Sequence, residues 1–224
     1  MLYRALVRRT LSCLAFVVCL VVTPPCAMAL SGASGRGALA DDDAGPRATV
    51  ERLNDALIAA MKTPGVDGYS ARWETLDPVV RDSFDFPTVA RLVLGARWKT
   101  YDQPTRDRFL DVFSRYVVAN YAAEFDSYSG HEFRTDEVRE QHRGVVVVRC
   151  TLSTGSGETH PFDYQLREKG GHWLIINVAV DGVSDLALKR SQYAAVIKKN
   201  GFDALLSTLE DKVRGFARGE KDDD

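Results

Sequence analysis

The spacing of the apolar residues changes twice along this 224-residue chain, and the changes limit the folds that it can adopt. Before Gly130 the apolar residues recur every three or four positions, which is typical of amphipathic helices. Over residues 131–180 they alternate with polar residues, as in half-buried strands. From Val183 onwards the helical spacing returns. Helices, then a run of antiparallel strands, then helices again predict an α+β domain.

Start and stop residues define most of the helices. Asp85 is an N-cap residue for a helix that Gly95 ends. Asp102 and Pro104 open the longest helix, whose apolar face continues to Tyr121. We expect the helices over residues 47–63 and 69–83, from Asp85 to Gly95, from Asp102 through Tyr121, over residues 183–198 with Ser184 as the cap, and from Phe202 through Phe216.

Two glycine-containing turns, at residues 155–157 and 169–171, separate the strands. The segment 173–180 is apolar on both faces, as expected of a strand that is covered on both sides. The sheet should be strongly curved, with helices packed on its concave side, and this arrangement can leave an apolar hollow between helix and sheet. We expect the strands over residues 131–141, 146–152, 162–166 and 173–180.

The N-terminus has the composition of a secretory signal peptide. Three arginines, the last of them Arg9, precede an almost wholly apolar run over residues 11–22. At 1.5 Å per residue this run reaches roughly 18 Å, short of the roughly 30 Å core of a bilayer, which disfavours a membrane anchor. We therefore expect a signal peptide over residues 1–29, cleaved after Ala29 or at a second small-residue site after Ala40, and a periplasmic mature protein.

The rest of the chain divides into a flexible linker over residues 30–46, one domain over 47–217 and a charged tail over 218–224. Loss of residues 1–29 leaves 26 basic and 31 acidic residues, so the formal net charge becomes −5. A net-acidic domain argues against a nucleic-acid partner and against permanent docking on anionic lipid. Cys150 is the only cysteine left, so no internal disulfide is expected.

The sequence contains no motif for catalysis. The four histidines lack the spacing of a zinc site and are expected to be solvated or at strand edges. Neither a nucleophile elbow nor a phosphate-binding glycine loop is present. These observations predict a protein that is not an enzyme and that uses no metal and no cofactor.

Four short motifs are distinctive in their shared order, namely Phe84-Asp85-Phe86-Pro87, Val93-Leu94-Gly95 with Trp98, Val180-Asp181-Gly182-Val183-Ser184, and Arg190-Ser191-Gln192-Tyr193. They resemble the MlaC family, the periplasmic phospholipid-binding components of the Mla lipid-transport system, and the resemblance covers about residues 47–217. Asn177 stands where the family usually has Asp, and Tyr193 where it usually has Phe, so the resemblance does not define which lipid is bound. Residues 119–130 are in addition similar to the hopanoid-associated branch of this family, called HpnM.

The resemblance implies a nuclear-transport-factor-like fold, with a curved antiparallel sheet and N- and C-terminal helices packed on it. It implies an apolar cavity for a phospholipid or a hopanoid-type lipid. It also implies two partners, an inner-membrane ABC lipid transporter complex and an outer-membrane lipoprotein complex, which together maintain outer-membrane lipid asymmetry. We expect the cavity to be lined by Val93, Phe109, Phe113, Val117, Tyr121, Tyr164, Trp173 and Ile197, with Arg91, Arg97 and Lys99 near its mouth.

The sequence leaves two alternatives to a lipid carrier. An enzyme or small-molecule binder on a similar scaffold would need a buried ionisable pair, such as Asp163 with a histidine. An envelope adaptor that binds no ligand would have a solid core with no hollow beneath the sheet.

Overall fold

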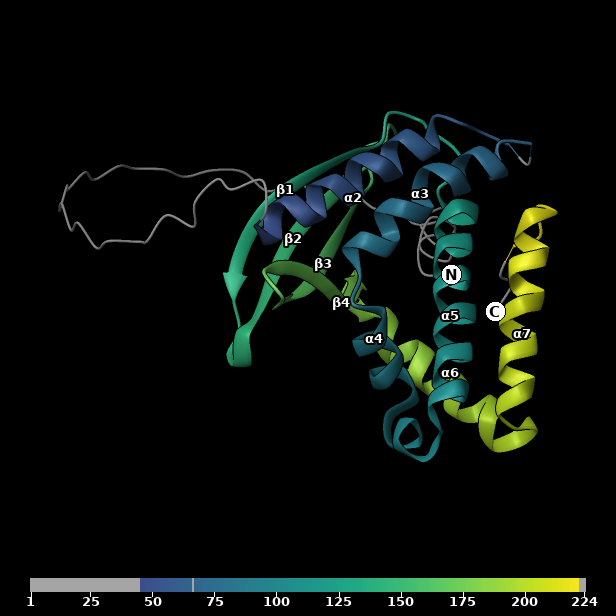
Figure 1. Ribbon diagram of the computed structural model, residues 1–224. Helices are drawn as coiled ribbons and strands as arrows, with labels where there is room; N and C mark the ends of the chain where they lie inside the picture. Colours follow the sequence, from purple (N-terminus) through teal and green to yellow (C-terminus); the bar gives the residue numbers. More distant parts are fainter. Residues whose placement is uncertain (1–44, 66, 222–224) are drawn as a thin grey trace, which may run out of the picture.

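The computed structural model describes residues 45–65 and 67–221 of the chain (Figure 1). The expected signal peptide and nearly all of the expected linker lie outside the described residues. The order is helices, strands, helices, which confirms the α+β class. The elements are α2 (Pro46–Met61), α3 (Tyr69–Ser83), α4 (Phe86–Leu94), η1 (Gly95–Thr100), α5 (Gln103–Glu124), β1 (Glu132–Glu140), η2 (His142–Gly144), β2 (Val145–Ser153), β3 (Thr159–Lys169), β4 (His172–Val180), β5 (Val183–Ser184), α6 (Asp185–Asn200) and α7 (Phe202–Ala217).

The sheet is an open antiparallel meander in the order β1-β2-β3-β4-β5. Its long strands bend visibly, and α2 lies along them (Figure 1). Irregular pairing interrupts the register at Thr135/Glu137 and at Gln165/Leu166. Such bulges bend a strand and increase its twist, so they contribute to the expected curvature.

The two faces of the central strands differ in chemistry because successive side chains point to opposite sides. One face is apolar and fully buried, and the other carries the ion pair in which Arg149 Nε and Nη2 donate to the Asp163 carboxylate at 2.6 and 2.8 Å. The buried face of β2 and β3 consists of Val148, Cys150, Leu152, Phe162, Tyr164 and Leu166.

Strand β4, which β5 covers only at its C-terminal end, anchors the start of α4. The Asp85 backbone N–H donates to the Ile175 carbonyl at 3.0 Å. Asp85 Oδ1 caps α4 by accepting from the Thr88 N–H at 3.2 Å, and it also accepts from Lys169 Nζ at 2.9 Å. Burial alone would raise the pKa of Asp85, but these hydrogen bonds together hold it below its ordinary value. The cap expected from the sequence therefore also fixes α4 against the sheet.

Helices α5 and α7 lie side by side and run in the same direction, with α6 passing near their lower ends (Figure 1). Arg108 Nη1 pairs with Asp203 Oδ1 at 2.9 Å near their first turns. Further along, the rings of Tyr116 and Phe216 stack with centroids 6.2 Å apart. None of the helices in the described part of the chain combines the length and the apolar character needed to cross a bilayer.

Three local features differ from the expectations. Val183 pairs with Val180 in β5, so α6 begins two residues later than expected, although Ser184 caps it as predicted. Lys221, in the expected tail, returns to the domain and pairs with Asp126 at 2.6 Å. His131 and His160 are buried rather than solvated. His131 accepts from the Ser129 N–H in the loop before β1, and His160 lies beside Asp181, contacts that sequence periodicity does not describe.

Candidate binding pocket

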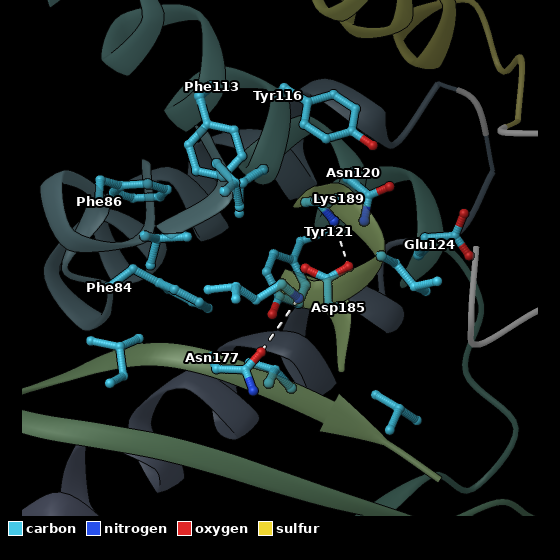
Figure 2. A pocket seen from close by; sticks show the side chains of 18 of the residues that line it. Phe84, Phe86, Phe113, Tyr116, Asn120, Tyr121, Glu124, Asn177, Asp185 and Lys189 are labelled. Carbon is cyan, nitrogen blue, oxygen red and sulfur yellow. Dashed lines mark hydrogen bonds and ion pairs between the residues drawn. The ribbon is translucent and has the colours of Figure 1, made fainter. Parts of the chain in front are cut away.

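A pocket opens between α4, α5, α6 and the edge of the sheet at β4 (Figure 2). Its cavity volume is about 120 Å³. Most of the described side chains that line it are apolar. They come from the α3–α4 junction, from one face of α5, from β3 and β4, and from the first two turns of α6. The hollow expected between helix and sheet is therefore present.

Aromatic rings form one end of the pocket (Figure 2). Phe84 is the extended residue that ends α3, and Phe86 is the first residue of α4. Because only the capping residue Asp85 separates them, both rings fall at the same helix junction, with centroids 5.8 Å apart. Phe113 of α5 meets Phe86 edge to face at 6.1 Å. Such packed rings make a wall with no hydrogen-bonding groups.

Polar side chains gather at the other end. Asn120 and Glu124 of α5 and Asp185 and Lys189 of α6 line this part of the pocket, with Glu124 at its outer side (Figure 2). Lys189 Nζ lies 2.5 Å from Asp185 Oδ1, one helical turn away. The Lys189 side chain is only 12% exposed, whereas that of Asp185 is 45% exposed. Lys189 Nζ also lies 5.8 Å from the centre of the Tyr116 ring, within range of a cation–π contact.

The start of α6 is tied to the sheet by Asn177. The Asn177 Oδ1 atom accepts hydrogen bonds from Ser184 Oγ at 2.9 Å and from the Leu186 N–H at 3.3 Å. Ser184 Oγ in turn accepts from the Ala187 N–H at 3.2 Å. These bonds occupy two of the backbone donors that a helix N-terminus otherwise leaves open. On α6, the contribution to the polar end of the pocket therefore comes from side chains rather than from these backbone N–H groups.

Tyr121 lies inside the pocket, between its two ends. Burial of the phenol raises the pKa of Tyr121 far above its ordinary value, and the nearby Asp185 carboxylate raises it further. The hydroxyl therefore stays protonated at every physiological pH. It is a neutral group on an otherwise apolar wall.

The structure brings four of the eight expected cavity residues together. Val93, Phe113, Val117 and Tyr121 all line the pocket. Phe109 lies one layer behind them, with its ring stacked on Phe113 at a centroid distance of 5.4 Å.

The other three expected cavity residues lie outside the pocket lining. Tyr164 is fully buried on the α2 side of the sheet, where its hydroxyl donates to Asn54 Oδ1 at 2.7 Å. Trp173 and Ile197 are half-buried residues that pack against the core. The candidate mouth residues also lie outside the lining, and these are Arg91, Arg97 and Lys99. The lining cations are instead Lys189 and Lys212.

Sequence reasoning did not select the residues at the two ends of the pocket. Phe84 and Phe86 were noted as part of a motif, but nothing in their spacing shows that both rings face one cavity. Lys189 and Asp185 have the spacing of an ordinary surface ion pair on a helix. The sequence therefore contains no signal for this end of the pocket, because the low exposure of the Lys189 side chain, 12%, is seen only in the structure.

The contacts of the remaining ionisable candidates do not favour catalysis. Asp163 is paired with Arg149 on the polar face of the sheet, not with a histidine. His160 Nδ1 lies 3.1 Å from Asp181 Oδ2, and neither residue lines the pocket. Within residues 45–65 and 67–221, no three acidic, histidine or cysteine side chains converge as a metal site would require.

The fold and the pocket define an α+β protein with a cavity that is apolar at one end and charged at the other. The chain belongs to the MlaC protein family, whose sequence model matches residues 51–211.

Relatives and a solved structure agree with this assignment. The chain is 23% identical over 170 residues to the toluene tolerance protein ttg2D of Pseudomonas putida, an alignment that covers 75% of this chain and 76% of that protein. It is 21% identical over 122 residues to the intermembrane phospholipid transport system binding protein MlaC of Haemophilus influenzae, covering 53% of this chain and 57% of that protein.

The fold is similar to that of a phospholipid-binding protein from Ralstonia solanacearum, solved in complex with a phospholipid. The TM-score is 0.66 and the sequence identity 21%, over 77% of this chain and 98% of that one. This likeness confirms the fold. The names of the Haemophilus and Ralstonia proteins describe phospholipid binding or transport rather than catalysis, in agreement at the family level with the prediction that the chain is not an enzyme.

Proposed function

We propose that this protein is an exported lipid carrier that holds phospholipid acyl chains in the pocket between α5, α6 and β4. The observation that carries the proposal is the polarity of that pocket. Its aromatic end suits hydrocarbon, and its charged end suits a headgroup at the mouth. Family membership and the phospholipid found in the Ralstonia structure support the same ligand class.

The energetic reason for such a carrier is the cost of exposing acyl chains to water. Burial of each CH₂ group is worth about 0.8 kcal/mol, so two long chains cost on the order of 20 kcal/mol to expose. A pocket lined by aromatic and branched side chains offers an environment similar to the bilayer interior. Loading and unloading are then nearly balanced, and direction must come from partners. We propose that these are an inner-membrane ABC lipid transporter and an outer-membrane lipoprotein complex, reached through the periplasm after the N-terminal signal is removed.

The cavity must widen to accept a lipid. Its volume of about 120 Å³ is below the roughly 300 Å³ at which small-molecule pockets begin. Of its walls, α6 is held least firmly, since Tyr193 is its only buried residue, whereas α5 has ten. We propose that α6 moves away from α5 and β4 when acyl chains enter.

The ligand class includes a hopanoid-type lipid as an alternative to phospholipid. The aromatic wall made by Phe84, Phe86 and Phe113 suits a fused-ring hydrocarbon as well as an acyl chain. Mass analysis of the lipid that the protein retains separates the two, because their masses and fragmentation differ.

A blocking variant tests the site. Val117 is half-buried and lines the pocket, so Val117→Trp should fill the cavity without opening the core. Val79 is also a half-buried helical valine but lies outside the lining, so Val79→Trp is the matched control. Native mass spectrometry should show lipid on the wild type and on Val79→Trp, and an empty Val117→Trp. Full lipid occupancy in folded Val117→Trp would contradict the proposed site.

A further inference from the structure

The charged side chains of the pocket balance one another. Among the described lining residues, Glu124 and Asp185 are acidic, and Lys189 and Lys212 are basic. Asn177, which holds the start of α6, carries no charge. The formal charge of the described lining is therefore zero, and both signs are present where a headgroup would lie.

Each member of the ion pair between Lys189 and Asp185 can bind a second partner. An ammonium group has three N–H donors, and Asp185 Oδ1 accepts one of those of Lys189. A carboxylate has two oxygens and about four acceptor positions, and the half-exposed Asp185 turns part of its surface to solvent. A ligand with an anionic and a cationic group can therefore bind beside the pair without breaking it.

We propose that the charged end of the pocket recognises a zwitterionic headgroup, with its phosphate at Lys189 and its ammonium group at Asp185. The proposal rests on the lipid-binding function proposed above. It names the preferred class of lipid, namely zwitterionic rather than anionic phospholipid.

Charge balance gives the reason for this preference. A headgroup with only a phosphate would pair with Lys189 but would bring a second negative charge beside Asp185. A zwitterionic headgroup brings a cation for this carboxylate together with the anion. Because exposed charge pairs are worth up to about 1 kcal/mol, we expect a preference of about fivefold.

The experiment is a competition between two lipids with identical acyl chains. The purified full mature chain is incubated with vesicles of equimolar dioleoyl phosphatidylethanolamine and dioleoyl phosphatidylglycerol and then separated from them. Mass spectrometry measures the ratio of the two lipids that the protein retains. The wild type should retain the zwitterionic lipid in about fivefold excess.

Two variants should move this ratio in opposite directions. Asp185→Asn removes the partner of the ammonium group, so the ratio should fall to about one or below. Asn177→Asp keeps the hydrogen-bond acceptor of Asn177 but adds a negative charge, so the ratio should rise. Asp203→Asn makes the same charge change as Asp185→Asn on an exposed residue of α7 outside the pocket, and it should leave the ratio unchanged.

The outcomes separate this proposal from the one on which it rests. Retention of both lipids in the proportion of the vesicle would overturn the headgroup proposal and leave the carrier function standing. The same conclusion follows if Asp185→Asn and Asp203→Asn change the ratio equally, since the effect would then be one of net charge. Retention of neither lipid by the wild type would instead overturn lipid binding itself.

Discussion

Arg72 is a buried cation that joins three segments of the backbone. Its side chain is buried, with Nε donating to the Ala122 carbonyl at 2.7 Å. Nη1 donates to the carbonyls of Thr63 and Gly65 at 2.8 and 2.7 Å. The residue thereby fixes the α2–α3 loop to the last turn of α5, which leads into the pocket wall at Glu124 and Phe125.

Loss of the Arg72 guanidinium should therefore destabilise the whole domain. Arg72→Met keeps much of the apolar stem but leaves three carbonyls without their donor. Because hydrogen bonds to charged groups are worth about 1.5–3 kcal/mol each, we expect a loss of at least about 3 kcal/mol. Urea unfolding measures this loss, with Arg52→Met on the exposed face of α2 as the control. Equal midpoints for the two variants would show that Arg72 has no such role.

His131 should make stability depend on pH. Burial of the ring lowers the pKa of His131 below its ordinary value near 6.5, and the neighbouring His160 lowers it further. The Ser129 N–H donates to His131 Nδ1 at 3.1 Å, which requires that nitrogen to be unprotonated. The folded state binds this proton less readily than the unfolded state. The contribution of neutral His131 to stability is therefore complete above about pH 6.5, and it is lost as the pH falls towards the lowered pKa of the folded state.

The expected result is a melting temperature that falls as the pH is lowered from about 6.5 to 5, and that falls less in His131→Asn. The exposed His172→Asn should keep the wild-type pH dependence. Protonation of Asp85 also lowers stability, but only in a separate pH range near and below pH 4, because the pKa of Asp85 is lowered from an ordinary value of 3.8. A pH profile unaltered by His131→Asn would contradict the assignment.

Helix α6 is the least buried of the long elements around the pocket. It spans 16 residues, yet Tyr193 is its only buried side chain. Leu188, which lines the pocket, is 36% exposed. Few buried contacts allow local opening at a low free energy, so α6 should open more readily than α5.

Hydrogen–deuterium exchange tests this difference. In lipid-free protein, the amides of α6 should exchange faster than those of α5. Acyl chains that pack against Leu186 and Leu188 should then slow the exchange of α6, while α2, none of whose residues lines the pocket, should show little change. Exchange in α6 that is as slow as in α5, with or without lipid, would exclude α6 as the moving wall.

Sequence alone predicted the helices that local chemistry defines. Asp85 and Asp102 both act as N-caps, and α3 has the expected bounds, because capping and periodicity act over a few residues. The start of α6 was misplaced because Val183 is bound by its pairing with Val180, a contact that periodicity does not describe.

At the scale of the whole molecule, the sequence predicted the layers but only part of the cavity. Val117 and Tyr121 fall on the expected face of α5 and line the pocket, whereas Phe109 falls on the same face and packs behind it. Cavity-lining and core residues share one periodicity. Which of them meets open space depends on the angle at which α5 and α6 cross the sheet, and no local pattern specifies that angle.

The polarity of the pocket connects the fold to its proposed use. Strand β4 and α5 supply most of the apolar wall, and the charges come from Asp185 and Lys189 of α6 with Glu124 of α5 and Lys212 of α7. A lipid should therefore lie in one orientation, with its chain ends towards Phe84 and Phe113 and its headgroup towards Lys189. The signal peptide and the linker stay predictions, since they lie outside the described residues.

Photo-crosslinking with a phospholipid that carries a diazirine at the end of one acyl chain tests this account most directly. After illumination and proteolysis, mass spectrometry should place the label on the peptides that contain Phe84, Phe86 and Phe113, and Val117→Trp should abolish it. Label spread over the outer surface, for example at the exposed Tyr128, with none on the pocket peptides, would contradict the account.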